Sequence, residues 1–174
     1  MKTNSLLYSI LILFSSCTVK EVVGPLFPPI TNTGAMAITY KANGEQFYAG
    51  PYGYGDTGGA SGRITIYNDS LSIGLSVGSI GTQDMYNLYI TVINFTGKGN
   101  YLLGGISKNS AQFHALKLIL HNQYITDTTH TGFFSVTTFD TQKKIVSGTF
   151  YFNAKNTYSG DVISVTDGQF DFKY

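Results

Sequence analysis

The sequence has little cysteine and little charge, and both shortages limit what the protein can be. Among 174 residues there is one cysteine, Cys17, so no disulfide bond within the chain can stabilise the fold. Lys, Arg, Asp and Glu make up 12% of the chain, about half of the usual share. Without Lys2, ten basic residues balance ten acidic ones. A balanced charge gives no long-range attraction for nucleic acid or anionic lipid, so we expect no nucleic-acid partner.

Residues arranged for catalysis are also scarce. Ten carboxylates are present, but nothing in the sequence pairs two of them across a cleft, as glycosidases require. Asp167 and Asp171 flank a turn and a strand, where capping and solvation are the ordinary roles. Cys17 lies in the leader described below, which leaves no thiol nucleophile in the body of the chain. We therefore predict no catalytic residue and no enzyme activity, with an envelope hydrolase acting on glycan or lipid as the alternative.

The three histidines give no clear metal motif. His114, His121 and His130 are seven and nine residues apart, whereas metal sites favour close pairs on one helix face or one strand face. Strands could still bring two of them together, with Asp127 as a further ligand. Solvated or capped histidines are the simpler interpretation, so we predict no metal and no cofactor.

The N-terminus has the layout of a secretory signal peptide. Lys2 precedes an apolar run, Leu6 to Phe14, which is too short to span a bilayer, since spanning takes about 20 apolar residues. Two small residues then precede Cys17. The run Phe14-Ser15-Ser16-Cys17 resembles a bacterial lipobox, with Phe14 in place of the usual Leu. The resemblance implies cleavage before Cys17, a diacylglyceryl group on its sulfur and a fatty acyl group, such as palmitate, on its nitrogen. A plain signal peptide with an incidental free cysteine is the alternative.

A linker follows the lipidation site. We divide the chain into residues 1–16 as the lipoprotein signal peptide, 17–34 as the lipidated N-terminus and linker, and 35–174 as the folded domain. Three of the four prolines lie between residues 25 and 29, which favours an extended, semi-rigid tether. Lys20-Glu21 resembles the charged export signals of surface lipoproteins only faintly, and a solvated linker is the favoured interpretation. We expect attachment to the outer membrane through acylated Cys17, on its periplasmic face or at the cell surface.

The composition of the domain favours strands. Thirteen Tyr and twelve Phe raise the aromatic share to 14%, and such residues fit pleated surfaces. Alternation of apolar and polar residues recurs along residues 35–174, with turn signals such as Asn43-Gly44 between the runs. We count about nine or ten short strands and predict an all-β domain, either a single antiparallel β-sandwich or a small β-barrel. The run Ala111 to His121 fits a helix or a strand, and its neighbours favour one strand.

The last thirty residues, Ile145 to Tyr174, show the pattern best. Apolar residues alternate with polar ones on both sides of a turn at Asn156 to Gly160, and Asp167-Gly168 marks a tight turn or a bulge. We predict that the phenylalanines of this stretch share one core. They are Phe150, Phe152, Phe170 and Phe172.

A glycine-rich segment, Gly50 to Gly62, interrupts the strands. It lacks the Gly-Lys-Ser/Thr ending of a phosphate-binding loop, so we interpret it as a surface loop. Its tyrosines, Tyr52 and Tyr54, are candidate ligand-binding residues that could stack on a sugar or an apolar molecule. The alternative is that both rings fold onto the sheet and close one end of the core.

Two short segments resemble the acidic-hydroxyl-apolar signal for O-glycosylation of exported proteins. They are Asp69-Ser70-Leu71 and Asp127-Thr128-Thr129. Both fall at predicted turns, where an enzyme can reach the hydroxyl group. Ser70 and Thr128 are therefore candidate modification sites.

Several stretches resemble one family. The segments TYKANGEQFYA, LYITVINFTGKGNYLL, VSGTFYFNA and VTDGQFDFKY, together with the lipobox, look like the DUF6252-type uncharacterised lipoproteins of Bacteroidetes. The resemblance covers most of the mature chain and implies an envelope location and a β fold, but no activity and no site residues.

A non-enzymatic module and a hydrolase are the two classes of function that remain for such a domain. We predict a non-enzymatic binding or structural module of the cell envelope, whose partner is a glycan, a small apolar ligand or an envelope protein. An integral outer-membrane β-barrel is a further alternative, because alternating strands are compatible with one. It is disfavoured because a lipid anchor is redundant for such a barrel, and because most predicted strands are shorter than the about 9–11 residues that a bilayer needs.

Overall fold

The computed structural model describes residues 31–49, 60–78, 85–105, 107–117 and 120–174, and the regular elements in these ranges are all strands. There are eleven of them: β1 (Ala37–Ala42), β2 (Glu45–Ala49), β3 (Ala60–Tyr67), β4 (Ser70–Gly78), β5 (Met85–Ile93), β6 (Gly99–Leu103), β7 (Ser110–Lys117), β8 (Leu120–Ile125), β9 (Gly132–Asp140), β10 (Ile145–Asn156) and β11 (Val162–Lys173). The predicted all-β class is confirmed.

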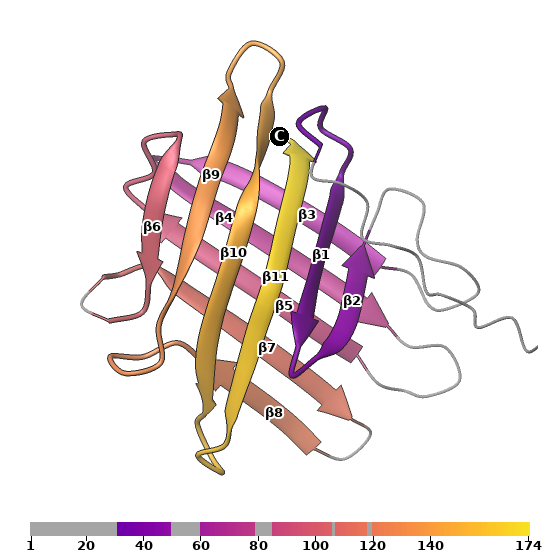
Figure 1. The fold of residues 1–174 in the computed structure, drawn as a ribbon, viewed down its shortest axis with the longest axis vertical. Helices are drawn as coiled ribbons and strands as arrows, with labels where there is room; N and C mark the ends of the chain where they lie inside the picture. The colour runs from indigo at the N-terminus through magenta and orange to yellow at the C-terminus, as the bar shows by residue number, and fades with distance from the viewer. Residues whose placement is uncertain (1–30, 50–59, 79–84, 106, 118–119) are drawn as a thin grey trace, which may run out of the picture.

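The strands form one antiparallel sheet that folds over into two layers (Figure 1). The first layer has the order β6-β9-β10-β11-β1-β2, and the second has the order β3-β4-β5-β7-β8. β10 connects them, because Ile145 to Phe152 pair with β9 whereas Lys155 and Asn156 pair with β8. The strands of the second layer cross behind those of the first, which gives a sandwich that is open along part of its edge.

One prediction about strands is wrong. The run Ala111 to His121 is two strands, the end of β7 paired with the start of β8, and not one. The described residues thus form eleven strands, close to the predicted nine or ten. β10 and β11, with 12 residues each, are the longest of these strands.

The predicted turns have the backbone that their residues favour. Asn43 and Gly44 both have positive φ, +48° and +85°, and so do Asn68 and Asp69, +45° and +58°. Positive φ at both central positions is the signature of the two-residue hairpin turns that match the twist of paired strands. Asp167, with φ +53°, lies where the register of β11 shifts against β1 and β10, so Asp167-Gly168 marks a bulge.

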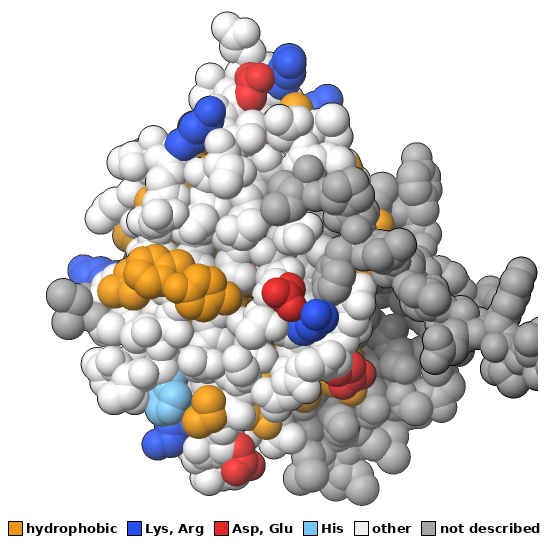
Figure 2. Space-filling model, viewed as in Figure 1, with side chains coloured by type: hydrophobic (Ala, Val, Ile, Leu, Met, Phe, Trp, Pro, Cys, Tyr) orange, Lys and Arg blue, Asp and Glu red, His pale blue; other side chains and the backbone are white. Residues whose placement is uncertain are grey.

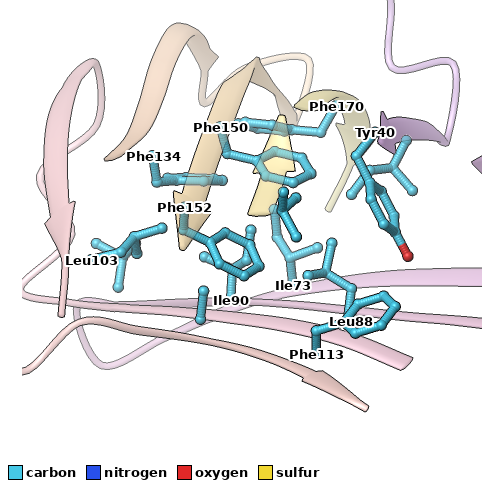
Figure 3. Packing of buried hydrophobic residues seen from close by; sticks show 14 of the residues in the cluster. Tyr40, Ile73, Leu88, Ile90, Leu103, Phe113, Phe134, Phe150, Phe152 and Phe170 are labelled. Carbon is cyan, nitrogen blue, oxygen red and sulfur yellow. The ribbon is translucent and has the colours of Figure 1, made fainter. Parts of the chain in front are cut away.

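The core lies between the two layers (Figure 3). The phenylalanines of β10 and β11 that were predicted to share one core are all buried in it. Phe134 of β9 stacks on Phe170, with ring centroids 4.6 Å apart and planes at 11°. The second layer contributes mainly aliphatic side chains: Leu71, Ile73, Leu88, Ile90 and Val92. Burial of apolar area on this scale is the main stabilising contribution in a domain without disulfides.

The segment that precedes β1 is attached to the first layer through one carboxylate. Asp171, on the outer face of β11, is only 4% exposed. It accepts hydrogen bonds from the backbone N–H groups of Thr33 (3.1 Å), Gly34 (2.9 Å) and Ala35 (3.1 Å), and from the hydroxyl of Thr31. Residues 31–35 therefore pack on the sheet, and the carboxylate satisfies backbone donors that no strand partner could reach.

Candidate binding site

Two aromatic rings stand side by side on the outer face of the first layer. Phe133 of β9 and Tyr151 of β10 are directly paired across the two strands. Their neighbours Phe134, Phe150 and Phe152 point into the core, so the alternation of a strand sends Phe133 and Tyr151 outward. The ring centroids are 5.9 Å apart with planes at 48°, and the residues are 38% and 54% exposed. We call these two residues the aromatic pair.

The aromatic pair belongs to a row that crosses the strands. Leu102 of β6 pairs with Phe133 and extends the apolar surface toward the edge of the layer. On the other side, Lys41 of β1 and Asp167 of β11 form an ion pair with Nζ and Oδ2 3.0 Å apart. Figure 2 shows a hydrophobic patch over β6, β9 and β10, with an acidic and a basic side chain close together beside it.

The next row along the same face is polar and uncharged. Asn100, Ser135, Thr149 and Gln169 are successive partners across β6, β9, β10 and β11. Their side chains are half-buried or exposed. Amides and hydroxyls both donate and accept hydrogen bonds. The face thus combines two open ring surfaces with a row of neutral hydrogen-bonding groups, which suits a ligand with apolar faces and hydroxyl edges.

The sequence analysis did not single out the aromatic pair, although a signal was present. Consecutive aromatic residues, Phe133-Phe134 and Phe150-Tyr151-Phe152, occur in two runs of strand character. Because successive side chains point to opposite faces, such runs must expose at least one ring unless a further layer covers the outer face.

A second sequence feature also went unnoticed. Gly74-Leu75-Ser76-Val77-Gly78 has the spacing of the Gly-x-Ser-x-Gly elbow of α/β-hydrolases. That elbow needs a sharp turn from a strand into a helix, and here all five residues lie within β4. The structural context of the elbow is therefore absent at this run.

The predicted site residues fall into two groups. Cys17, Tyr52 and Tyr54 lie outside the described residues, and their roles stay predictions. Ser70 is half-buried at the start of β4, and its hydroxyl donates to the carbonyl of Val92 at 3.3 Å. Thr128 is exposed in the turn between β8 and β9. The two modification candidates thus differ in how accessible their hydroxyl groups are.

Asp127 organises the turn that carries Thr128. Its Oδ1 accepts hydrogen bonds from the backbone N–H of His130 at 2.7 Å and of Thr129 at 2.8 Å. These bonds hold the pKa of the Asp127 carboxyl well below its usual range, with that from His130 the larger cause. Nδ1 of His130 lies 2.9 Å from the same oxygen, so Asp127 caps this histidine.

The described parts of the chain give no metal site and no helical membrane span. Within them no group of three or more His, Cys, Asp or Glu side chains is arranged to hold a metal ion. The same ranges contain no helix long and apolar enough to cross a membrane.

Comparison with known proteins places the chain in a family whose function is not known. A family model described as "Domain of unknown function (DUF6252)" matches residues 75–172, from the end of β4 to the end of β11. No curated protein sequence and no solved structure gives a significant match. The matched region includes both strands of the aromatic pair.

Proposed function

The chain belongs to the DUF6252 family, and we propose that it is a non-enzymatic binding module of the bacterial cell envelope that recognises a glycan through Phe133 and Tyr151. The observation that carries the proposal is the aromatic pair itself, two exposed rings 5.9 Å apart beside a row of polar side chains. Large apolar side chains that are exposed side by side lose the stabilisation that burial gives, and such patches mark interaction sites.

The chemistry around the aromatic pair favours a neutral ligand. Lys41 and Asp167 neutralise each other at one end of the row, and the adjacent row consists of amides and hydroxyls. A sugar ring presents C–H groups on its faces, which pack on aromatic rings, and hydroxyl groups at its edges, which hydrogen-bond to amides and hydroxyls. Tyr151 can serve both needs, because its ring is apolar and its hydroxyl is polar.

A lipid anchor at Cys17 would hold this module at the outer membrane. Residues 31–35 are fixed to β11 by Asp171, so a tether that precedes residue 31 would join the domain at its first layer. The same layer carries the aromatic pair. The proposal thus places the binding surface on the layer to which the tether is attached.

Affinity electrophoresis of the full chain tests the proposal. Soluble xyloglucan, a β-1,3-glucan and amylose serve as probes, and we expect at least one of them to retard the chain. The double variant Phe133→Ser, Tyr151→Ser should lose that retardation while its melting temperature changes little, since both side chains are exposed. Tyr158→Ser is the matched control, because Tyr158 is a surface tyrosine, 86% exposed, in the turn between β10 and β11. Retention of binding by the double variant, or no retardation of the wild-type chain by any probe, contradicts the proposal.

A further inference from the structure

A second exposed ring lies at the centre of the opposite layer. Tyr89 is on β5, which has β4 on one side and β7 on the other. Leu88 and Ile90 point into the core, so Tyr89 points to the outer face of the second layer. The residue is 43% exposed. Tyr89 therefore exposes part of its side chain to solvent although it lies on a central strand and not in a loop.

On the side toward β4, the neighbour of Tyr89 is a glycine. Gly74 is the direct partner of Tyr89 in the ladder, and a Cβ atom at position 74 would lie 3.6 Å from Cδ1 of the ring. That separation is an ordinary van der Waals contact, so the ring would also fit over an alanine at position 74. Ser72, the next outward residue on β4, is small and exposed. No large side chain from β4 therefore covers the ring at these two positions.

The side toward β7 carries hydrogen-bonding groups. The ring of His114 lies 5.5 Å from that of Tyr89, centroid to centroid, and at 78° to it. Nε2 of His114 is 3.3 Å from Oε1 of Gln112, and Nε2 of Gln123 on β8 is 3.5 Å from the same oxygen. Partial burial lowers the pKa of His114, which keeps the imidazole neutral at pH 7. The group thus consists of one open ring and three neutral polar side chains from two strands.

The described outward residues next to this group on β4, β5 and β7 carry no formal charge, and the nearest described cation by strand pairing is Lys155 of β10, which pairs with Ile125 beyond Gln123. Asn87 pairs with His114, and the outward residues on either side along β5 and β7 are Thr91 and Ser110. A charged ligand would find no partner among them, whereas a neutral hydroxylated one finds donors and acceptors beside an apolar ring.

We propose that Tyr89, His114, Gln112 and Gln123 form a binding site for a single uncharged sugar ring, which stacks on Tyr89 and hydrogen-bonds to the other three side chains. The site is separate from the one in the proposed function, because it lies on the other layer and shares no residue with it (Figure 1). If Tyr89 has a purely structural role and only covers Gly74, no sugar should bind at this group.

Histidine ring signals give a direct test. The chain has three histidines, so the imidazole resonances in a carbon–proton NMR spectrum of the full chain are few and assignable with a His114→Gln variant. Maltohexaose, cellohexaose and chitohexaose are titrated separately. We expect one of them to shift the His114 signals in a saturable way, while those of His130, in the turn before β9, stay unchanged.

Two variants separate this site from the structural role and from the proposed function. Tyr89→Ala should abolish the saturable shift of His114. Gly74→Ala should preserve it, because the added methyl group meets the ring only at contact distance. The double variant Phe133→Ser, Tyr151→Ser should also preserve it, because the two sites share no residue. A negative result for one of the two proposals therefore does not contradict the other. Absence of a saturable His114 shift with all three oligosaccharides, or its persistence in Tyr89→Ala, overturns the proposal.

Discussion

The ring of Phe150 occupies the space that a side chain at Gly168 would need. The two residues are direct partners across β10 and β11, and a Cβ atom at position 168 would lie 2.5 Å from Cδ2 of Phe150 and 2.4 Å from its carbonyl oxygen. The relationship is reciprocal. Gly148 is the partner of Phe170, whose Cζ would lie 3.0 Å from a Cβ at position 148. Each strand carries the spacing Gly-x-Phe, and antiparallel pairing places each ring over the glycine of the other strand.

We therefore predict that Gly168→Ala and Gly148→Ala destabilise the fold. Overpacking in a core costs typically about 1–3 kcal/mol and occasionally more. Gly148→Ala should cost the more of the two, because its Cβ would lie 1.9 Å from the carbonyl oxygen of Ser135, whereas a Cβ at position 168 would lie 2.4 Å from that of Phe150. Thermal and urea unfolding measure the effect.

Gly74→Ala is the matched control for both glycine variants. Its φ is not in the left-handed region, it also lies beneath an aromatic ring in a paired strand, and its Cβ would make only an ordinary contact. We expect its free energy of unfolding to stay within about 0.5 kcal/mol of the wild type. Equal stability of Gly168→Ala and Gly74→Ala would rule out the reciprocal packing.

Part of this fold could be predicted from local patterns in the sequence. Alternation alone predicted that Phe150, Phe152, Phe170 and Phe172 are buried together, and local turn chemistry predicted the hairpin at Asn43-Gly44. Both features depend on neighbours in sequence. The break in the run Ala111 to His121 was missed because the residues between β7 and β8 are Leu118 and Ile119, which carry no turn signal.

The remaining features could not be predicted because they depend on contacts between residues far apart in the sequence. The burial of Asp171 depends on residues 31–35, more than 130 residues earlier in the chain, and nothing local in the sequence indicates that contact. The aromatic pair depends on which face of β9 and β10 stays uncovered once the two layers have formed. Periodicity shows that two faces exist, but only the topology decides which of them another layer covers.

The contact of Asp171 with residues 31–35 gives a second prediction. Asp171→Asn keeps the shape of the side chain but replaces one acceptor oxygen with an NH₂ group that faces N–H donors. We expect a loss of about 1.5–3 kcal/mol in the free energy of unfolding, the range for hydrogen bonds to a charged group. Gly34 donates to Oδ1 and Ala35 to Oδ2, so one of these two N–H groups loses its acceptor in the variant, and its amide hydrogen exchange should become faster.

Asp167→Asn is the control on the same strand. Asp167 forms an ion pair with Lys41 in which both side chains are substantially exposed, and such pairs contribute about 0–1 kcal/mol. If Asp171→Asn is no more destabilising than Asp167→Asn, the carboxylate does not hold the N-terminal segment.

The third prediction concerns modification at Thr128. If an enzyme glycosylates a hydroxyl group of this chain, Thr128 is the better acceptor, because it is exposed whereas Ser70 is half-buried and donates to Val92. We expect the intact mass of the native protein to exceed that of polypeptide plus lipid, and Thr128→Ala to remove the excess. Ser70→Ala should leave it in place. A native mass that equals polypeptide plus lipid dismisses both sites.

The fourth prediction concerns attachment. The apolar run before Cys17 and the lipobox-like residues around it motivate the expectation that Cys17→Ser releases the protein into the soluble envelope fraction. Each buried CH₂ of an acyl chain contributes about 0.8 kcal/mol, so several chains anchor a domain firmly. Fractionation followed by immunoblotting measures the change. Membrane association of Cys17→Ser equal to that of the wild type would remove the basis for the lipid anchor.

The last prediction concerns Tyr40, which is fully buried between the layers and whose hydroxyl group has no hydrogen-bond partner among the residues that the structure describes. The ring stacks on Phe47. It also packs against Phe113 and Phe150, which are labelled with it in Figure 3. An unsatisfied buried hydroxyl costs about 1–3 kcal/mol, so Tyr40→Phe should leave stability unchanged or raise it by up to that amount. Tyr101→Phe is the control and should lose about 0.5–1.5 kcal/mol, because the Tyr101 hydroxyl donates to the carbonyl of Gly97 at 2.7 Å.

The same hydroxyl predicts a dependence on pH. Burial, with a smaller contribution from the charge of Glu45, raises the pKa of Tyr40 above its ordinary value in the folded state. In the unfolded chain the phenol ionises near pH 10, so the stability that depends on its neutral form is complete below pH 10 and falls as the pH rises beyond it. The wild type should therefore lose stability relative to Tyr40→Phe by about 1.4 kcal/mol per pH unit above pH 10. Other tyrosines affect both proteins equally, so parallel curves of unfolding free energy between pH 9 and about 11 would show that the Tyr40 hydroxyl is not held away from water.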